Sequence, residues 1–442
     1  MPVHTSRPRP RTRVARPLAL LMLVGLVLGS VPAVASAPGV TAAAAAPAAA
    51  AAPGGNRFTP PNGVLLSDPT IPGRKRVILD RIIASVNATK RGEYIRTAVW
   101  NYDDRRTTDA LIAAHRRGVH VQVVVADSVR NANWNRTTAA LNANRNDRSF
   151  ATRCRGGCRS RSILHAKFVL ISKVGRAGKV SMVGSFNLTR PAGYRQWNDL
   201  VTTSDKRFYD QLVTTFREYA QDRNLARPYR RTTIGSKTIT LWPSFERNTI
   251  RDELSQVRCN PPGGYGAPTK VRIAIAGWFD EFGTSIARTV RRLWDSGCDV
   301  KIITTLAGRG VNRVLKSGRG RGPVPIRRLI IDANGDRVPE KYLHMKAIAI
   351  RGGFGKDASA DVLLTGSPNW SERAHRSDEI LFRFLSVPVY VKRYSDHVDR
   401  LFRGPMARKD ITDGVRPPAD GGGAYEIGPG RRPSVPSWYE LS

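Results

Sequence analysis

The chain has 442 residues, of which 72 are Lys or Arg and 35 are Asp or Glu, so its formal net charge is +37. Hydrophobic residues make up 41% of the chain, which excludes wholesale disorder. No interior stretch of 18 or more apolar residues occurs, which excludes a polytopic membrane protein. The charge favours acidic partners such as nucleic acid, anionic lipid or a wall polymer, and the alternative is a merely solvated basic surface.

The N-terminus has the pattern of an export signal. Residues 1–16 hold five arginines and no acid, and the apolar run LALLMLVGLVLG and a set of small residues follow. This order predicts a signal peptide over residues 1–37 and a secreted, bacterial protein. We expect cleavage after Ala37 or, alternatively, after Ala35, and the alternative to cleavage is a membrane anchor.

Composition also divides the rest of the chain. Residues 38–57 are mostly Ala, Pro and Gly, which predicts a linker. We expect two α/β halves over residues 58–235 and 236–403. The Pro- and Gly-rich residues 404–442 predict an irregular tail.

Four cysteines in an exported chain predict two disulfides, with three possible pairings. A local bridge between Cys154 and Cys158 fits the Gly-containing loop RCRGGCR, and Cys259 and Cys298 would then pair. The alternative is a zinc site that includes His165. No second cysteine pair stands at metal-ligand spacing, so we expect no metal.

The same order of features occurs twice. Residues 94–128 and 270–307 each show a β-branched run, an aromatic residue followed by Asp, an amphipathic stretch and a second apolar run. This pattern predicts parallel strands joined by a crossover helix. LHAKFVLIS then resembles LHMKAIAI, and MVGSFNLT resembles LTGSPNWS, in the same order and at near-constant offsets. The sequence therefore predicts a duplicated α/β unit.

Each copy places H-x-K at the start of an apolar strand, as His165 with Lys167 and as His344 with Lys346. Alternation along a strand puts the two side chains of a pair on one face. An imidazole beside an ammonium suits a phosphate ester, because the Lys can hold an oxygen while the His attacks phosphorus or protonates a leaving group.

G-S-x-N and then an acid follow in each copy. Glycine lets the backbone approach an anion, and Ser and Asn can donate hydrogen bonds to phosphate oxygens. The expected phosphate-binding residues are Lys167, Lys346, Ser185, Asn187, Ser367 and Asn369. The acids Asp199 and Glu379 are expected to orient the imidazoles.

With these motifs, the sequence resembles the phospholipase D superfamily over about residues 75–403. The resemblance implies an α/β fold, a duplicated α/β/α sandwich whose two mixed-sheet halves are related by a pseudo-two-fold axis, with the active site between them. It also implies that one His attacks phosphorus to give a phosphohistidine, while the other protonates the leaving alcohol and then activates water or an acceptor alcohol. No metal or other cofactor is implied. Because the family usually places the nucleophile in the N-terminal half, we assign His165 as nucleophile and His344 as acid/base.

One position departs from the family motif, which has an Asp five residues after each Lys. This chain has Ser172 and Arg351 there. That Asp is generally structural in the family, so we expect activity despite the departure, although the chain lies outside the best-matched phospholipases.

We predict a secreted, monomeric phospholipase D that hydrolyses phospholipid head groups. The first alternative is a metal-independent, nonspecific endonuclease, which the basic clusters at residues 153–161, 223–231 and 309–328 also fit. The second is an inactive module that binds an anionic ligand, which the intact motifs disfavour. Phe186, Trp197 and Trp370 lie near the motifs and fit an acyl channel, a base-stacking platform or the core.

Overall fold

The computed structural model describes residues 58–244, 246–333 and 339–408. The chain divides into two units, residues 1–51 and 52–442, and all described residues belong to the second. The predicted signal peptide, the predicted linker and residues 409–442 of the predicted tail lie outside the described residues. Within the described part, no helix has both the length and the apolarity to cross a membrane.

The first half is built on a seven-stranded mixed sheet with the order β1-β8-β6-β5-β2-β3-β4. Strands β2, β3 and β4 run parallel to one another, and the other neighbours are antiparallel. The strands are β1 (Gly63–Leu66), β2 (Tyr94–Val99), β3 (His120–Val125), β4 (Phe150–Arg153), β5 (Lys167–Val174), β6 (Ala177–Gly184) and β8 (Asp199–Thr203). The helices are η1 (Pro72–Arg74), α1 (Val77–Ala88), α2 (Arg105–Arg116), α3 (Ala132–Leu141), α4 (Arg190–Tyr194) and α5 (Lys206–Gln221).

The second half repeats this order as β10-β18-β17-β16-β12-β13-β14, again with a parallel set, β12, β13 and β14. These strands are β10 (Lys237–Leu241), β12 (Lys270–Trp278), β13 (Asp299–Ala307), β14 (Ile326–Ile331), β16 (Lys346–Phe354), β17 (Asp357–Gly366) and β18 (Ile380–Leu385). Short strands extend the sheet, namely β7 (Gln196–Trp197), β9 (Arg230–Ile234), β11 (Val257–Arg258), β15 (Lys341–Leu343) and β19 (Ala407–Arg408). The helices are α6 (Thr249–Leu254), α7 (Asp280–Asp295), α8 (Arg309–Leu315), α9 (Glu372–His375) and α10 (Pro388–Arg403).

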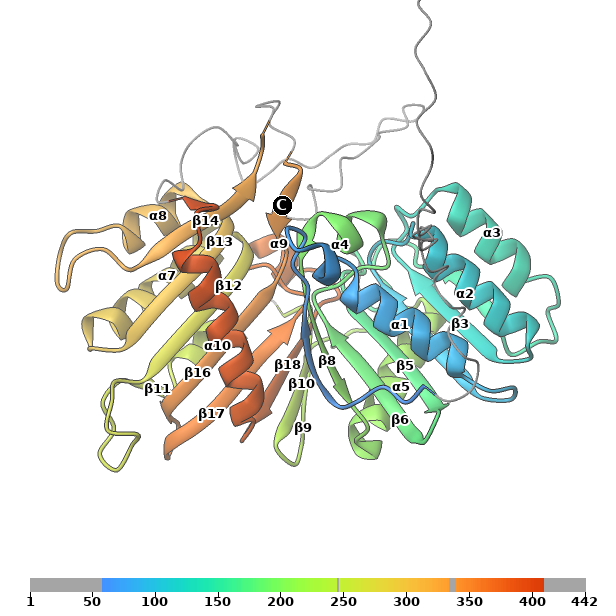
Figure 1. The fold of residues 1–442 in the computed structure, drawn as a ribbon, viewed down its shortest axis with the longest axis horizontal. Helices are drawn as coiled ribbons and strands as arrows, with labels where there is room; N and C mark the ends of the chain where they lie inside the picture. Colours follow the sequence, from blue (N-terminus) through green and yellow to red (C-terminus); the bar gives the residue numbers. More distant parts are fainter. Residues whose placement is uncertain (1–57, 245, 334–338, 409–442) are drawn as a thin grey trace, which may run out of the picture. The chain divides into compact units, whose positions relative to one another are not determined.

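The two halves therefore have the same fold, and the predicted duplication is confirmed. Figure 1 shows the two sheets next to each other, with α10 crossing the face of the second sheet and α1 covering the first. One apolar core is shared by both halves and includes side chains of α5 and α10. At its centre the ring of Phe208 lies 5.8 Å from that of Phe382 and 5.9 Å from that of Phe384. Apolar burial thus holds the halves together where the motifs meet.

The predicted division at residue 235 falls inside a hairpin. Strands β9 and β10 pair with each other across this residue, and both belong to the second sheet. By strand order, the chain changes sheets between α5 and β9. The short strand β7, which lies earlier in the chain, already pairs with β15 of the second half.

The structure joins Cys154 to Cys158 and Cys259 to Cys298, with Cα–Cα distances of 4.9 and 4.6 Å. Of the three possible pairings, the expected one is confirmed. Cys154 follows the C-terminal end of β4, whereas Cys298 precedes the N-terminal end of β13. In the shared strand order β13 corresponds to β3, the parallel neighbour of β4. One disulfide therefore lies at the C-terminal ends of the parallel strands of its sheet and the other at the N-terminal ends, so the two lie at opposite ends of their sheets.

Candidate active site

Both histidines are buried where the two halves meet, and each is held by the backbone of the other half. The backbone N–H groups of His165 and Ala166 both donate to the carbonyl of Asp378, at 2.9 Å each. The backbone N–H of His344 donates to the carbonyl of Trp197 at 3.0 Å. Side-chain access is small, since His165 is 4% exposed and His344 is fully buried. The start of each H-x-K strand is therefore fixed by a contact between the halves.

Glu379 orients His165 across this boundary. Its Oε1 lies 2.6 Å from Nδ1 of His165, and an ionised carboxylate can only accept, so Nδ1 carries the proton. Burial lowers the pKa of His165 to about 4, because it outweighs the opposing effect of the Glu379 charge. The structure thus places the predicted acid Glu379 against the histidine of the opposite half.

His344 is oriented by an amide that the sequence analysis missed. The Oδ1 of Asn198 lies 2.8 Å from Nδ1 of His344. The amide orientation is fixed, because Nδ2 of Asn198 donates to Oε1 of Gln196 at 2.9 Å. Oδ1 therefore accepts from His344, and the partner of this imidazole is neutral.

Asp199 occupies a different place from the one predicted. Its Oδ2 accepts from the hydroxyls of Thr365 and Tyr394, and burial raises its pKa. The backbone register explains the error. Ser185 N donates to Asp199 O, whereas Ser367 N donates to Ile380 O, so Asp199 corresponds to Ile380 and Asn198 to Glu379. The prediction matched the acid Asp199 to the acid Glu379, which aligns the two copies one residue out of register. A shift of one residue turns the side chains of a strand to the other face of the sheet.

The two lysines lie within the same site. Nζ of Lys167 donates to the carbonyl of His165 at 2.6 Å, and Nζ of Lys346 donates to that of His344 at 2.7 Å. After burial, the charges of Lys346 and Lys167 are the largest causes that hold the pKa of His344 well below its ordinary value. The structure thus brings both predicted H-x-K pairs together, and an anion placed there would be favoured.

The serines of G-S-x-N hold the orienting side chains. The Ser185 hydroxyl donates to Oδ1 of Asn198 at 2.9 Å, and the Ser367 hydroxyl donates to Oε2 of Glu379. These hydroxyls were predicted to bind phosphate. In the structure they instead donate to Asn198 and Glu379, the residues that orient the imidazoles. Asn187 and Asn369 are buried beside them, so their predicted role toward phosphate stays a prediction.

Comparison with known proteins agrees with this geometry. The family described as cardiolipin synthase, PLD-like domain, matches residues 82–220. The chain carries a phospholipase D-like domain. The resemblance drawn from the motifs is confirmed. No curated protein sequence matches the chain at a significant level.

Two solved structures share the fold across both halves. Phosphatidylserine synthase from Haemophilus influenzae Rd KW20 is 12% identical, with 78% of this chain and 86% of that chain covered and a TM-score of 0.54. Polyphosphate kinase from Porphyromonas gingivalis is 14% identical, with 81% of this chain and 53% of that chain covered and a TM-score of 0.52. The chain thus spans about half the length of that kinase.

Two aspartates of the repeated aromatic-Asp pattern bind the first residues of the short helices α4 and α9, which follow the two G-S-x-N segments. Oδ1 of Asp103 accepts from Arg190 N, and Oδ2 of Asp280 accepts from Glu372 N, at 2.8 Å each. Asp280 has φ +54°, a left-handed conformation that is strained for a non-glycine residue, and burial raises its pKa to about 6. The sequence repeat had marked these residues without showing this role.

The positions that depart from the family motif lie away from the histidines. Ser172 and Arg351 are each five residues along a strand from the lysine, which is about 16 Å at ~3.3 Å per residue. The Ser172 hydroxyl donates to Glu93 at 2.6 Å, and the Arg351 guanidinium lies 4.5 Å from the ring centroid of Tyr265. The replaced position therefore has no contact with the proposed chemistry.

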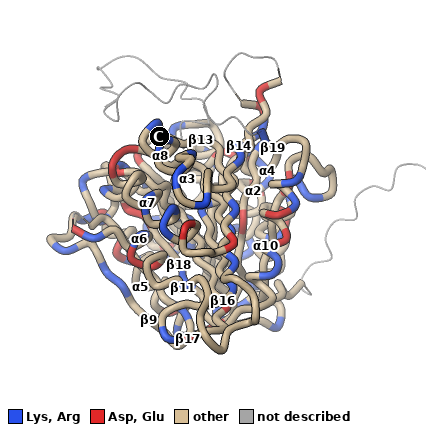
Figure 2. The backbone as a smooth tube through the Cα atoms, turned by 90° about the vertical axis from the view of Figure 1, so that its left-hand side faces the viewer, with Lys and Arg blue, Asp and Glu red and all other residues tan. Residues whose placement is uncertain are grey.

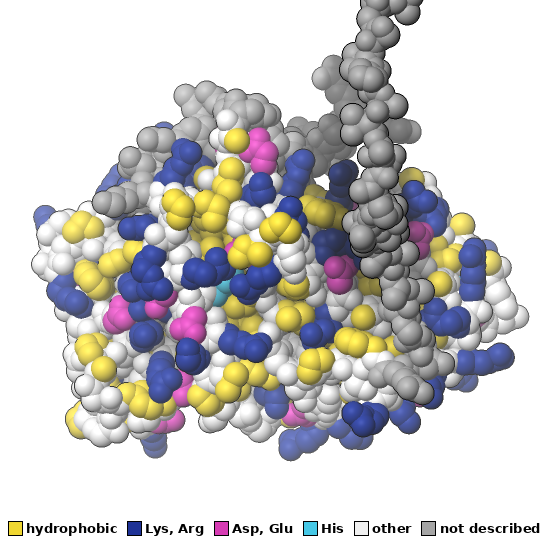
Figure 3. All heavy atoms as spheres, viewed as in Figure 1, with side chains coloured by type: hydrophobic (Ala, Val, Ile, Leu, Met, Phe, Trp, Pro, Cys, Tyr) yellow, Lys and Arg dark blue, Asp and Glu magenta, His cyan; other side chains and the backbone are white. Residues whose placement is uncertain are grey.

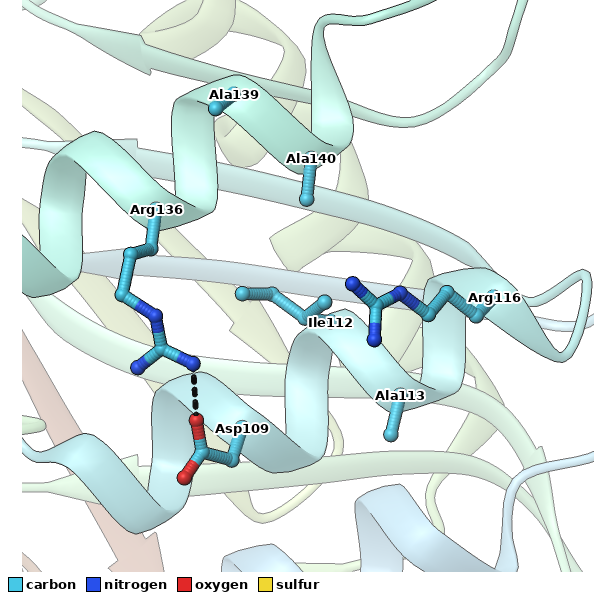
Figure 4. Close-up of a pocket in the computed structure, with 7 residues that line it drawn as sticks. All are labelled: Asp109, Ile112, Ala113, Arg116, Arg136, Ala139 and Ala140. Carbon is cyan, nitrogen blue, oxygen red and sulfur yellow. Dashed lines mark hydrogen bonds and ion pairs between the residues drawn. The ribbon is translucent and has the colours of Figure 1, made fainter.

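The aromatic residues near the motifs belong to the core. Phe186 and Trp197 are fully buried and Trp370 is 2% exposed, packed 4.6 Å from Trp278. They form neither an acyl channel nor a stacking platform at the surface. A separate pocket between α2 and α3 contains none of the site residues; its apolar floor is flanked by Arg116 and by an ion pair between Asp109 and Arg136 at 2.6 Å (Figure 4).

The predicted basic clusters divide into structural and exposed arginines. Arg159 is buried and lies 2.9 Å from Glu218, and Arg328 is buried with Nε 3.2 Å from the carbonyl of Thr305. Other members, such as Arg155 and Arg161, are exposed. Lys and Arg are spread along the described backbone in Figure 2. Within the described ranges, no group of three or more His, Cys, Asp or Glu is placed to hold a metal ion.

Proposed function

We propose that this chain is a phosphodiesterase that cleaves its substrate through a covalent phosphohistidine at His165. The observation that carries the proposal is the pairing of two buried imidazoles with two buried ammonium groups in one site, where one imidazole has a carboxylate partner and the other an amide. This asymmetry gives the two histidines different chemistry.

His165 suits the attack on phosphorus. Its Nδ1–H donates to Glu379, which leaves the Nε2 lone pair for the substrate. As the N–P bond forms, the imidazole becomes positive, and the Glu379 carboxylate compensates this charge. Lys167 and Lys346 neutralise the phosphate oxygens while the bond from phosphorus to the leaving oxygen breaks.

His344 suits proton transfer to that leaving oxygen. A neutral partner stabilises imidazolium less than a carboxylate would, so the proton of His344 is more readily given up. Binding of the anionic substrate offsets the two lysine charges that disfavour imidazolium. After the alcohol leaves, neutral His344 takes a proton from water, the water oxygen attacks phosphorus, and the N–P bond to His165 breaks.

For the substrate, we propose phospholipid head groups, with phosphatidic acid and a free alcohol as products and transphosphatidylation as a side reaction. The name of the matching family, cardiolipin synthase, supports phospholipid chemistry. We also propose that the protein is secreted and acts at an anionic membrane surface. The export-signal pattern and two disulfides within the described residues support secretion.

A second candidate, a metal-independent endonuclease, is favoured by exposed arginines close to the site. Five of them lie within four residues of a site residue in the sequence, namely Arg161, Arg190, Arg195, Arg373 and Arg376. Figure 3 shows basic side chains scattered over both halves of one face. Such a set fits successive phosphates of a polynucleotide.

One experiment separates these candidates. The chain is incubated in EDTA with phosphatidylcholine vesicles and, separately, with plasmid DNA. Choline release without nicking supports the phospholipase, and nicking without choline release shows the nuclease. Absence of both activities, with retained binding to the vesicles or to the DNA, would indicate an inactive binding module.

Substitution of the histidines tests the site under either activity. We expect His165→Ala and His344→Ala each to abolish turnover, whereas His120→Ala, outside both motifs, retains it. Wild-type protein that is quenched with denaturant at alkaline pH, where the N–P bond of a phosphohistidine is stable, should carry a phosphoryl adduct on the peptide with His165, detected by mass spectrometry. An adduct on His344 instead would reverse the assigned roles.

A further inference from the structure

Asp378 is a buried carboxylate beside the site that the mechanism above does not use. It is fully buried, and its Oδ2 accepts from the backbone N–H of Arg159 at 2.8 Å. The backbone of Asp378 also pairs with the segment before the first histidine. Its N–H donates to Ile163 O at 2.9 Å, and its carbonyl accepts from both His165 and Ala166. Asp378 thus contacts this segment through both its main chain and its side chain.

The carboxylate lies against the loop that the Cys154–Cys158 disulfide closes and bonds to Arg159, the residue directly after it. The Cys158 N–H and the Ser160 hydroxyl also stabilise its ionised form, although burial raises the pKa of Asp378 to about 6. The fit is close, because a Cβ on Gly157 would lie 2.9 Å from Oδ2 of Asp378 and 2.4 Å from Oγ of Ser160. Only glycine can take this position without displacing its neighbours.

Among the described residues of the other half, no carboxylate stands at the equivalent position. The residue equivalent to Asp378 is Trp197, because the Asp378 carbonyl accepts from His165 N and the Trp197 carbonyl accepts from His344 N. A tryptophan side chain has no acceptor for the N–H groups of a loop. The extra anchor is thus present only on the side of the proposed nucleophile. It also directly precedes Glu379, which orients that histidine.

We propose that Asp378 is a positioning residue for His165. Its carboxylate fixes residues 154–160, which include the loop closed by the Cys154–Cys158 disulfide, against the start of β18, which sets the position of Glu379 relative to the imidazole. The functional part of this inference rests on the proposed phosphohistidine chemistry. The position of the imidazole can be tested without it.

The kinetic test uses Asp378→Asn in the full chain, with bis(4-nitrophenyl) phosphate as the probe. The variant keeps the shape of the side chain but removes its charge. It places either an NH₂ group or a neutral oxygen where the carboxylate accepts from several donors. We expect kcat to fall about 100-fold, as for a small displacement of a reacting group, with KM unchanged. The matched control is Glu253→Gln, which removes another buried carboxylate, paired with Arg231 and Arg383, without touching either H-x-K segment. Its kcat should equal that of the wild type.

The structural test is the NMR resonance of the His165 Nδ1 proton, which reports the hydrogen bond to Glu379 whether or not the chain hydrolyses the probe. We expect Asp378→Asn to shift or remove this resonance and Glu253→Gln to leave it in place. If the wild type does not hydrolyse the probe but the resonance changes in Asp378→Asn and not in Glu253→Gln, the proposed function is overturned and the positioning role is kept. Unchanged kcat and an unchanged resonance in Asp378→Asn would overturn the positioning role.

A second pair of variants covers the case in which Asp378→Asn does not fold. Cys154→Ser with Cys158→Ser should lower kcat and shift the same resonance, because the loop that receives the carboxylate is opened. Cys259→Ser with Cys298→Ser removes the disulfide at the other end of its sheet and should change neither. Equal effects of the two pairs would contradict the proposal.

Discussion

At the scale of single residues, the difference between Asn198 and Glu379 sets the chemistry of the site. They occupy equivalent positions and accept from His344 and His165 respectively. We expect Glu379→Gln to lower kcat about 100-fold, because no charge then compensates the positive imidazole of the intermediate. The check is stopped-flow measurement of the first turnover, in which the burst of product should slow. A burst at the wild-type rate would contradict the role of the carboxylate.

The converse change places a charge beside the second histidine. Asn198→Asp should stabilise the imidazolium form and so raise the pKa of His344. His344 then stays protonated to higher pH, so the alkaline limb of the plot of kcat against pH moves to higher pH. The measurement is kcat against pH for this variant and for Glu372→Gln, a change at an exposed carboxylate, which should leave the limb in place. An alkaline limb that stays at the wild-type pH in Asn198→Asp would argue against His344 as the acid.

Most of the site residues could be predicted from the sequence because the motifs occur twice. His165, Lys167, His344 and Lys346 meet as expected, and Glu379 lies against an imidazole. Asn198 could not be found in this way, because its identity depends on which backbone groups pair after Ser185. A one-residue difference in strand register is invisible when both alignments place a polar residue near the site.

At the scale of elements, the two disulfides should differ in their contribution to stability. Cys259–Cys298 spans 39 residues and Cys154–Cys158 only 4. By loop-closure entropy, removal of the long-range bridge should lower the free energy of unfolding by about 4 kcal/mol and removal of the short one by about 2 kcal/mol. Urea unfolding of the two serine double variants measures this difference. An equal loss would show that native contacts of the short loop add to its entropic effect.

The order of strands and helices in each unit could be predicted from the periodicity of the sequence. The strand pairing between the two halves could not. Residues 94–128 and 270–307 form the expected strand–helix–strand units. By contrast, β7 pairs with β15, and Leu164 with Asp378, over more than 140 residues of sequence. Such pairings depend on how the two sheets dock through their shared core, and no local pattern encodes that arrangement.

At the scale of the whole molecule, the structure predicts loss of stability at acid pH. Burial lowers the pKa of His165 and His375 to about 4 and that of His397 to about 3. The unfolded chain, whose histidines titrate at about 6.5, therefore binds more protons than the folded chain as pH falls from about 7 to 4. Burial of Asp199, Asp280 and Asp378 acts the other way, because it raises their pKa, to about 6 for Asp280 and Asp378, so the folded chain binds these protons first.

The histidines should decide the outcome because they are more numerous and include His344, whose pKa is also held well below the ordinary value. We expect the urea midpoint to fall between pH 7 and pH 4.5. His397→Gln removes one of these groups, a buried side chain of α10 whose Nδ1 lies 3.1 Å from the Arg400 guanidinium, so it should reduce the fall. His120→Gln, at a more exposed histidine on β3, should leave it unchanged. A midpoint that rises on acidification would mean that the three aspartates outweigh the buried histidines.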